Sequence, residues 1–349
     1  QVGSTLTQAK ASWSLDPVYP VTYAWARCGN ESSTVTIGIP SDCSLISGAT
    51  SASYTVVSAD TGNYIRAVQV ASGAAGTYYA LSPSGPFVLG VGSKLAIGYT
   101  GSCVIKNGGV WCVGQGNYGS LGNNNTIASS TPVQVQKSAT AGDYLTNIVA
   151  IYGAKYGYTY CAIDDSARLW CWGASNTSYI LSSTNVDYKV ATQVLTTTRV
   201  AQVTLGLSGG TMCAITDGAT GAKGGALYCW GNEGGTSSWL GDGVIGGNKP
   251  ITSKVLLNLD GVIQVSGSTN TFCAVTKLGA LYCWGSGFTN KALPLAANAT
   301  TPTLVPGFDT GVSRVAVGNY EGCAIKDGGL WCWGGTVNGS QGTGTTTTS

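Results

Sequence analysis

The chain has 349 residues, of which 9% are charged, and its formal net charge is +2. The sequence contains no run of basic residues. It therefore argues against a nucleic-acid partner, because proteins bind nucleic acids through a positively charged face. Histidine is absent, which excludes Ser-His-Asp and Cys-His mechanisms; since no carboxylate pair stands out either, we expect no catalytic residue, no metal and no cofactor.

Residues 1–84 consist of short segments in which apolar and polar residues alternate, separated by Gly, Asn, Asp and Ser. Alternation of this kind at short intervals predicts an antiparallel β-sandwich. Trp25 and Tyr23 lie two residues apart and should point inward from one strand face. Cys28 and Cys43 should tie two neighbouring segments together. The alternating segments are residues 4–7, 21–27, 53–57 and 64–70.

This first part resembles a bacterial immunoglobulin-like repeat. The resemblance rests on Val2-Gly-Ser-Thr-Leu6, on Trp13, on Tyr23-Ala-Trp-Ala-Arg-Cys28, on the run from Cys43 to Thr50 and on Ala59-Asp-Thr-Gly62. Repeats of that family stand in tandem in large surface proteins, particularly of actinobacteria. The strand that normally precedes the Val-Gly stretch is missing or very short here, so we expect either that the chain was cut from a longer one or that a partner supplies this strand.

After a short Pro/Gly linker at residues 82–86, a second domain spans residues 85–349 and contains five cysteine pairs. In each pair, two apolar segments flank a polar Gly-containing or Asp-containing turn, which predicts a β-hairpin with a cysteine near each end. The first cysteines recur at steps of 58, 52, 60 and 50 residues, which indicates stacked or radial repeats. The pairs are Cys103 with Cys112, Cys161 with Cys171, Cys213 with Cys229, Cys273 with Cys283, and Cys323 with Cys332.

With Cys28 and Cys43, these pairs account for all 12 cysteines. Metal binding is the rival interpretation, but the spacing is not Cys-x-x-Cys and no histidine is available to assist. We therefore predict six local disulfides and an extracellular or cell-surface location, because disulfides persist in oxidising compartments. No apolar run approaches the roughly 20 residues needed to span a bilayer, so we expect no membrane span in this chain.

Each repeat unit contains more than its hairpin. A β-like segment precedes the hairpin in all five units, and another follows the variable loop in the first four. Four strands in a unit are typical of a propeller blade, so we predict an all-β chain with a five-bladed β-propeller after the sandwich. The fifth unit ends without its last strand, and we expect residues 86–90 to complete it and close the ring, which would remove two exposed sheet edges.

The second domain also resembles the bacterial form of the regulator of chromosome condensation repeat. The resemblance rests on Cys-Ala-Ile-x-x-Gly-x-Leu-Trp-Cys-Trp-Gly, best seen from Cys323 to Gly334, and on Gly-Asn-Tyr-Gly-Ser-Leu-Gly at residues 116–122. It implies a β-propeller; well-known members have seven blades, whereas we count five units. The exchange-factor and chromatin roles of the namesake are not expected here, because those belong to reduced intracellular proteins.

Aromatic residues flank the second cysteine of each unit, and two interpretations of them are open. Stacking against sugars is one, whereas recurrence at one blade position favours packing between blades. The variable loops carry a further set that forms a possible binding rim, for which ordinary loop anchoring is the alternative. The flanking residues are Trp111, Trp170, Trp172, Tyr228, Trp230, Tyr282, Trp284, Trp331 and Trp333, and the rim residues are Tyr118, Tyr179, Trp239 and Phe288.

These features predict a non-enzymatic extracellular structural or adhesive protein, such as a subunit of a surface appendage or a piece of a larger adhesin. Its partner would be a protein, either another copy of the chain or a cell-surface molecule. One alternative is a secreted protein-binding propeller that acts as an inhibitor, and another is a carbohydrate-binding module with a glycan partner.

Overall fold

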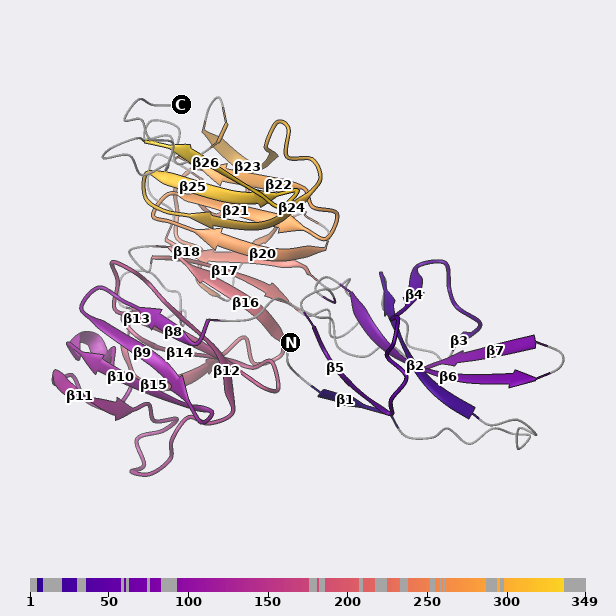
Figure 1. Cartoon of the computed structure of the whole chain (residues 1–349). Coiled ribbons are helices and arrows are strands. Elements are labelled where there is room, and N and C mark those ends of the chain that lie inside the picture. The colour runs from indigo at the N-terminus through magenta and orange to yellow at the C-terminus, as the bar shows by residue number, and fades with distance from the viewer. Residues whose placement is uncertain are drawn as a thin grey trace. The chain divides into compact units, whose positions relative to one another are not determined.

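The structure, a computed structural model, describes residues 5–8, 21–29, 36–57, 60, 63–73, 76–82, 93–175, 181, 186–206, 210–216, 225–232, 238–251, 255–257, 259, 261–286, 294–295 and 298–335. The chain divides into a compact unit within residues 1–91 and a second within residues 92–349 (Figure 1). Both units are built from antiparallel β-strands, so the predicted all-β class is confirmed.

The N-terminal unit contains a five-stranded sheet in the order β3-β7-β6-β2-β4 and a two-stranded sheet formed by β1 and β5. Three of these strands, β3, β4 and β7, were not among the predicted alternating segments. Their bounds are Thr5–Thr7 for β1, Val21–Cys28 for β2, Thr36–Ile37 for β3, Cys43–Leu45 for β4, Ser53–Thr55 for β5, Tyr64–Gly73 for β6 and Gly76–Leu81 for β7.

Trp25 is the centre of this unit's core. It is buried, as predicted, whereas Tyr23 on the same strand is only partly buried. The Trp25 ring lies 5.8 Å from the Tyr54 ring, and Leu6 of β1 packs against the same cluster. The small sheet is therefore held on the large one by apolar contacts around Trp25, and the predicted Cys28–Cys43 disulfide joins β2 to β4.

A buried carboxylate fixes the turn that leads into β6. Asp60 is fully buried and accepts hydrogen bonds from the Tyr54 hydroxyl and the Val57 amide, both at 2.8 Å. It also pairs with the guanidinium of Arg27. Burial and the hydrogen bond to Asp60 raise the pKa of Tyr54 above its ordinary value. A buried charge is stable only when it is paired in this way.

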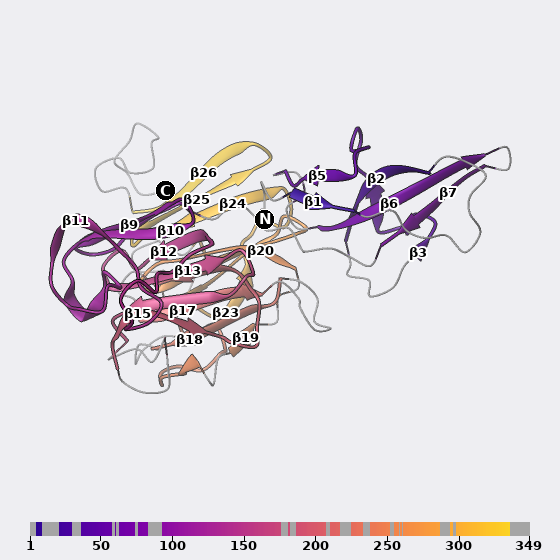
Figure 2. The same ribbon diagram turned by 90° about the horizontal axis from the view of Figure 1, so that it is seen from below.

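The second unit contains five sheets, here called blades one to five, which follow one another in chain order (Figure 2). Blade one consists of β8 (Leu95–Ile97), β9 (Gly101–Lys106), β10 (Gly109–Gly114) and β11 (Ser129–Gln134), and blade two of β12 (Ile148–Gly153), β13 (Thr159–Asp164), β14 (Leu169–Gly173) and β15 (Tyr188–Val194). Blade three consists of β16 (Val200–Leu205), β17 (Thr211–Thr216), β18 (Leu227–Gly231) and β19 (Val255–Leu257), and blade four of β20 (Val262–Gly267), β21 (Thr271–Thr276), β22 (Leu281–Gly285) and β23 (Ala299–Leu304). Blade five consists of β24 (Val312–Val317), β25 (Glu321–Lys326) and β26 (Gly329–Gly334).

Four strands per blade are thus confirmed in blades one to four. Blade five has three strands within the part of the chain that the structure describes. Residues 86–90, which we expected to complete it, lie outside the described residues.

The predicted cysteine pairs are all bonded, giving six disulfides and no free cysteine. In the blades, each bond joins directly opposed residues of the two hairpin strands. The bonds are Cys28 to Cys43 in the N-terminal unit and, in blades one to five, Cys103 to Cys112, Cys161 to Cys171, Cys213 to Cys229, Cys273 to Cys283 and Cys323 to Cys332.

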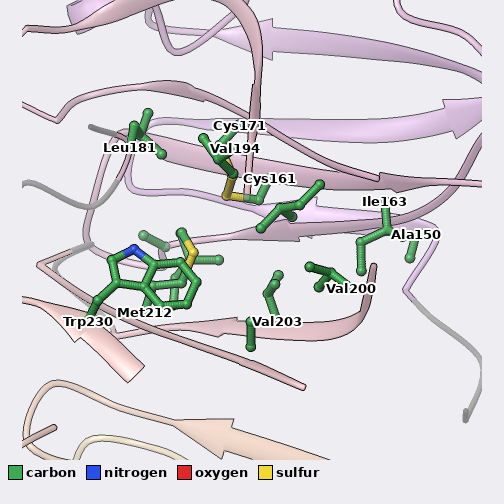
Figure 3. Packing of buried hydrophobic residues seen from close by; sticks show 14 residues of the cluster. Ala150, Cys161, Ile163, Cys171, Leu181, Val194, Val200, Val203, Met212 and Trp230 are labelled. Atoms are coloured by element: carbon green, nitrogen blue, oxygen red, sulfur yellow. A yellow bond between two sulfur atoms is a disulfide. The ribbon is translucent and has the colours of Figure 1, made fainter. Parts of the chain in front are cut away.

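The disulfides also fill the space between blades. Within blades one to four, the second cysteine of each pair is completely buried: Cys112, Cys171, Cys229 and Cys283. Both sulfurs of the Cys161–Cys171 pair belong to the cluster that blade two shares with Met212 and Trp230 of blade three (Figure 3). These cysteines are therefore core residues with no exposed chemistry, and the number of bonds indicates an oxidising environment.

The tryptophan after the second cysteine packs between neighbouring blades and hydrogen-bonds one to the next. Trp172, Trp230 and Trp284 are fully buried, as predicted for packing between blades. The indole Nε1 of Trp172 donates to the carbonyl of Ser120 at 3.0 Å, and that of Trp284 donates to the carbonyl of Trp239 at 3.0 Å. Each acceptor stands two residues before a glycine of positive φ in the loop of the preceding blade.

The inner strands β16, β20 and β24 are also joined by side chains. Amide or hydroxyl oxygens of one strand accept hydrogen bonds from backbone amides of the next, which satisfies donors that no neighbouring strand can reach. The donors and acceptors are Val265 N to Gln202 Oε1 (3.1 Å), Gly267 N to Thr204 Oγ1 (3.0 Å), Val315 N to Gln264 Oε1 (2.8 Å) and Val317 N to Ser266 Oγ (3.0 Å).

Replacing Cys161 and Cys171 together with serine should lower the free energy of unfolding by about 2–4 kcal/mol, because the bond restricts the unfolded chain and its sulfurs are buried. Denaturant unfolding followed by tryptophan fluorescence measures the change. Peptide mapping without reduction should recover the six local pairs, and bonds between different blades would contradict this organisation.

Gly122 has a φ of +67°, and a Cβ placed on it would lie 2.8 Å from Val135 Cγ1 and 3.1 Å from Trp172 Cδ1. We expect Gly122→Ala to cost about 2–4 kcal/mol from backbone strain and displacement of the indole. Gly142→Ala is the matched control, since its φ of +88° imposes similar strain while nothing lies within 4 Å. Equal losses of melting temperature in the two variants would show that the contact with Trp172 contributes little.

Candidate functional site

Four tyrosines gather where loops of blades one and two meet, and we call this group the tyrosine patch. The rings of Tyr118 and Tyr158 lie 5.0 Å apart. Tyr99 meets Tyr158 edge-on at 5.8 Å and Tyr156 at 6.5 Å. These separations fall in the range in which aromatic rings attract one another, so the four rings form one continuous surface.

The patch is open to solvent. Tyr156 is 61% exposed, Tyr99 57% and Tyr118 41%, while Tyr158 is partly buried beneath them. Exposed tyrosines present both an apolar ring and a hydroxyl, which suits them to bind protein surfaces and the faces of sugars. A cluster of this size on a rigid frame is a candidate recognition site.

Two neighbouring loops hold three of the four tyrosines of the patch. Tyr99 lies between β8 and β9, and Tyr156 and Tyr158 lie between β12 and β13. The Tyr99 amide donates to the Gly157 carbonyl at 3.1 Å, which ties the loops together. Below them, the buried Tyr160 hydroxyl donates to the Gly101 carbonyl at 2.8 Å.

Tyr118 reaches the patch from a short 3-10 helix at Asn117–Gly119, where it has φ of 59° and ψ of 16°. This left-handed conformation is strained for a residue with a side chain. The turn around it is held by Ser120, whose hydroxyl donates to the Gln115 carbonyl at 2.8 Å. Strain of this kind, held by the surrounding structure, is common at recognition sites.

A cavity of about 360 Å³ lies where the inner strands of all five blades converge. Its lining is mainly aliphatic, with Ile97 from blade one and Val317 from blade five among the contributors. Tyr152 and Lys155 add a hydroxyl and an ammonium group. Burial raises the pKa of Tyr152 above its ordinary value. Because all five blades line one space, their arrangement is radial.

Residues 107–153 match the family model of the regulator of chromosome condensation (RCC1) repeat. The second unit thus contains an RCC1 repeat, and its four-stranded sheets are consistent with the blades of an RCC1-repeat β-propeller. Residues of the chain are 27% identical over 252 positions to the E3 ubiquitin-protein ligase HERC2 of Homo sapiens and of Mus musculus, a match that covers 70% of this chain and 5% of each relative.

Human WBSCR16 and Prp20p from Saccharomyces cerevisiae are among the solved structures that are similar to the chain. Human WBSCR16 matches with a TM-score of 0.57 and 15% identity over 95% of this chain and 92% of that one, which shows a shared fold. Prp20p from Saccharomyces cerevisiae matches with a TM-score of 0.42 and 14% identity over 72% of this chain and 73% of that one.

The four predicted rim residues do not form one common surface among the described residues. Tyr118 lies in the tyrosine patch. Trp239 is partly buried, donates from Nε1 to the Ser286 hydroxyl at 3.2 Å and accepts the Trp284 indole hydrogen bond through its carbonyl, so it anchors its loop. Tyr179 and Phe288 lie outside the described residues. The sequence analysis did not single out Tyr156-Gly-Tyr158, although two closely spaced tyrosines in a loop could have indicated this site. Only the fold brings them close to Tyr99 and Tyr118.

The buried carboxylate of blade two has structural partners. Asp164, the last residue of β13, is buried and accepts hydrogen bonds from the Arg168 guanidinium at 2.7 Å and the Trp170 indole at 3.0 Å. Within the described ranges, no group of three or more His, Cys, Asp or Glu residues is placed to hold a metal ion. In the same ranges, no helix is long and apolar enough to cross a membrane.

Burial raises the pKa of Tyr160 to about 12, whereas an unfolded tyrosine titrates near ~10. The native state therefore retains a proton that the unfolded state loses. The stability from this group is fully present below pH ~10 and should decline by about 2–3 kcal/mol as pH rises through ~12.

Tyr160→Phe should reduce this alkaline decline, and denaturant unfolding at several pH values between ~9 and ~12 measures it. Tyr99→Phe, at an exposed position of the neighbouring loop, is the control and should follow the unsubstituted protein. An unchanged decline in Tyr160→Phe would contradict the role assigned to this buried phenol.

Proposed function

We propose that the chain is a non-enzymatic extracellular protein with a structural or adhesive role, and that its propeller binds a protein partner through the tyrosine patch. The patch is the observation that carries this proposal. Tyrosines contribute large contact areas at low entropic cost, and they are enriched in the residues that dominate binding energy at protein interfaces.

The six disulfides support an extracellular role, because they would keep the blades assembled in an oxidising medium. In this proposal the N-terminal unit is an immunoglobulin-like spacer of a bacterial surface protein. Its two antiparallel sheets around Trp25 and its Cys28–Cys43 bond are compatible with that assignment. The partner is a second copy of the chain or a cell-surface protein.

Glycan binding is the second candidate, and the same patch favours it. Tyrosine rings stack on the apolar faces of sugars, and hydroxyls at their tips bond to sugar hydroxyls. An inhibitor-like propeller would use the patch as a protein-binding surface in solution. The ligase activity in the name of HERC2 is not transferred, because the chain spans only 5% of that protein.

The experiment compares the full chain with a Tyr99→Ala, Tyr156→Ala double variant on arrays of extracellular proteins and glycans and in sedimentation velocity. We expect a protein ligand, or self-association, that weakens at least tenfold in the variant. Tyr320→Ala is the matched control, because Tyr320 occupies the corresponding loop of blade five, is 54% exposed and lies outside the patch.

If a glycan binds instead, and its binding depends on the patch in the same way, the function is carbohydrate recognition. Equal binding by the patch variant and the Tyr320 variant would contradict the role of the patch. Both variants change exposed side chains, so their melting temperatures should stay close to that of the unsubstituted protein.

A further inference from the structure

The fourth strands of blades one to four follow a common pattern. Each places a Val or Leu opposite an aliphatic residue of the third strand, and two residues earlier a Val or Thr opposite the second cysteine. The aliphatic residues of both strands are at most 4% exposed. The opposed pairs are Val110 with Val135, Leu169 with Val194, Leu227 with Leu257 and Leu281 with Val305, and the residues opposite cysteine are Val133 on Cys112, Thr192 on Cys171, Val255 on Cys229 and Thr303 on Cys283.

Within the described residues, blade five has the third strand of this pattern and no fourth strand. Leu330 of β26 occupies the position of Leu281, yet it is 72% exposed, whereas Leu281 is completely buried. The neighbouring Trp331 is 56% exposed. Among the described residues, no strand pairs with the outer edge of β26.

The backbone of β26 is directed toward this edge. In blade four, the Leu281 amide donates to the Phe308 carbonyl at 2.8 Å, and its carbonyl accepts from the Val305 amide at 2.9 Å. Leu330 stands in the same register against β25 as Leu281 against β21. Its amide and carbonyl therefore face outward, where an added strand would pair with them.

We infer that the outer edge of β26 is a binding site for an extended segment of a partner protein, which adds an antiparallel fourth strand to blade five. The four occupied blades define the chemistry of that segment. It is uncharged over the paired residues, carries Val or Thr opposite Cys332 and places Val or Leu on Leu330. Main-chain hydrogen bonds supply affinity in such additions, and the alternate side chains supply specificity.

This site is separate from the tyrosine patch and goes beyond the proposed function, since it gives the protein a second means of assembly. The charges of the adjoining hairpin do not oppose a neutral segment, because Lys326 at the end of β25 pairs with Asp327 in the turn at 2.7 Å. Burial of Leu330 would remove the apolar exposure that distinguishes blade five from the other four.

The test uses the full chain and a labelled peptide with the sequence of residues 298–305, Asn-Ala-Thr-Thr-Pro-Thr-Leu-Val, the strand that fills this position in blade four. Without peptide, the Leu330 amide should exchange with solvent far faster than the Leu281 amide. With peptide, we expect saturable binding in fluorescence anisotropy and slower exchange at Leu330.

Leu330→Asp should weaken peptide binding at least tenfold. Leu278→Asp is the matched control, because Leu278 is 76% exposed in the hairpin turn of blade four, and it should bind like the unsubstituted chain. A peptide with Asp at its last position should also bind at least tenfold more weakly. The Tyr99→Ala, Tyr156→Ala double variant should retain peptide binding, so this test is independent of the patch.

Three results would overturn the inference. They are a Leu330 amide already protected in the free chain, which would mean that the chain itself fills the edge; equal binding by Leu330→Asp; and no saturable binding by a chain whose Leu330 amide exchanges freely.

Discussion

The insertion of a tryptophan from one blade into the loop of the blade before it holds the propeller together. A blade has one hydrophobic face toward each neighbour and cannot bury either alone. Trp172 and Trp284 fill the space between sheets and donate their only hydrogen bond to a carbonyl of the preceding blade. Each indole therefore contributes apolar burial and a directional bond, which fixes both the spacing and the register of adjacent blades.

The loops can vary because this frame is rigid. In blade one, the loop that accepts Trp172 also positions Tyr118, so inter-blade packing and the tyrosine patch share one short segment. In blade three, Trp239 in the corresponding loop is used as an anchor instead. A single structural position thus serves recognition in one blade and stability in another, according to the side chains that surround it.

Comparison of equivalent positions in the repeated blades shows how blade five differs from the other four. Where a fourth strand is present, the aliphatic residue of the third strand is buried and its backbone is paired. Where the described structure contains none, the equivalent Leu330 remains exposed. A single exposed leucine is ordinary by itself. Because the same position is filled in the other blades, however, they define the geometry and the side chains of a segment that would cover Leu330.

The sequence by itself determined the hairpins, the six cysteine pairs and the four strands of most blades, because these features depend on contacts between residues close along the chain. It also indicated that Trp172, Trp230 and Trp284 pack between blades, since they recur at one position. Only the tertiary structure placed Tyr99 beside Tyr158. It also showed that Tyr118 belongs to the tyrosine patch, whereas Trp239 anchors its loop. Those outcomes depend on how neighbouring blades rotate and pack, and loop side chains distant in sequence, such as Tyr99 and Tyr158, meet only after that packing is complete.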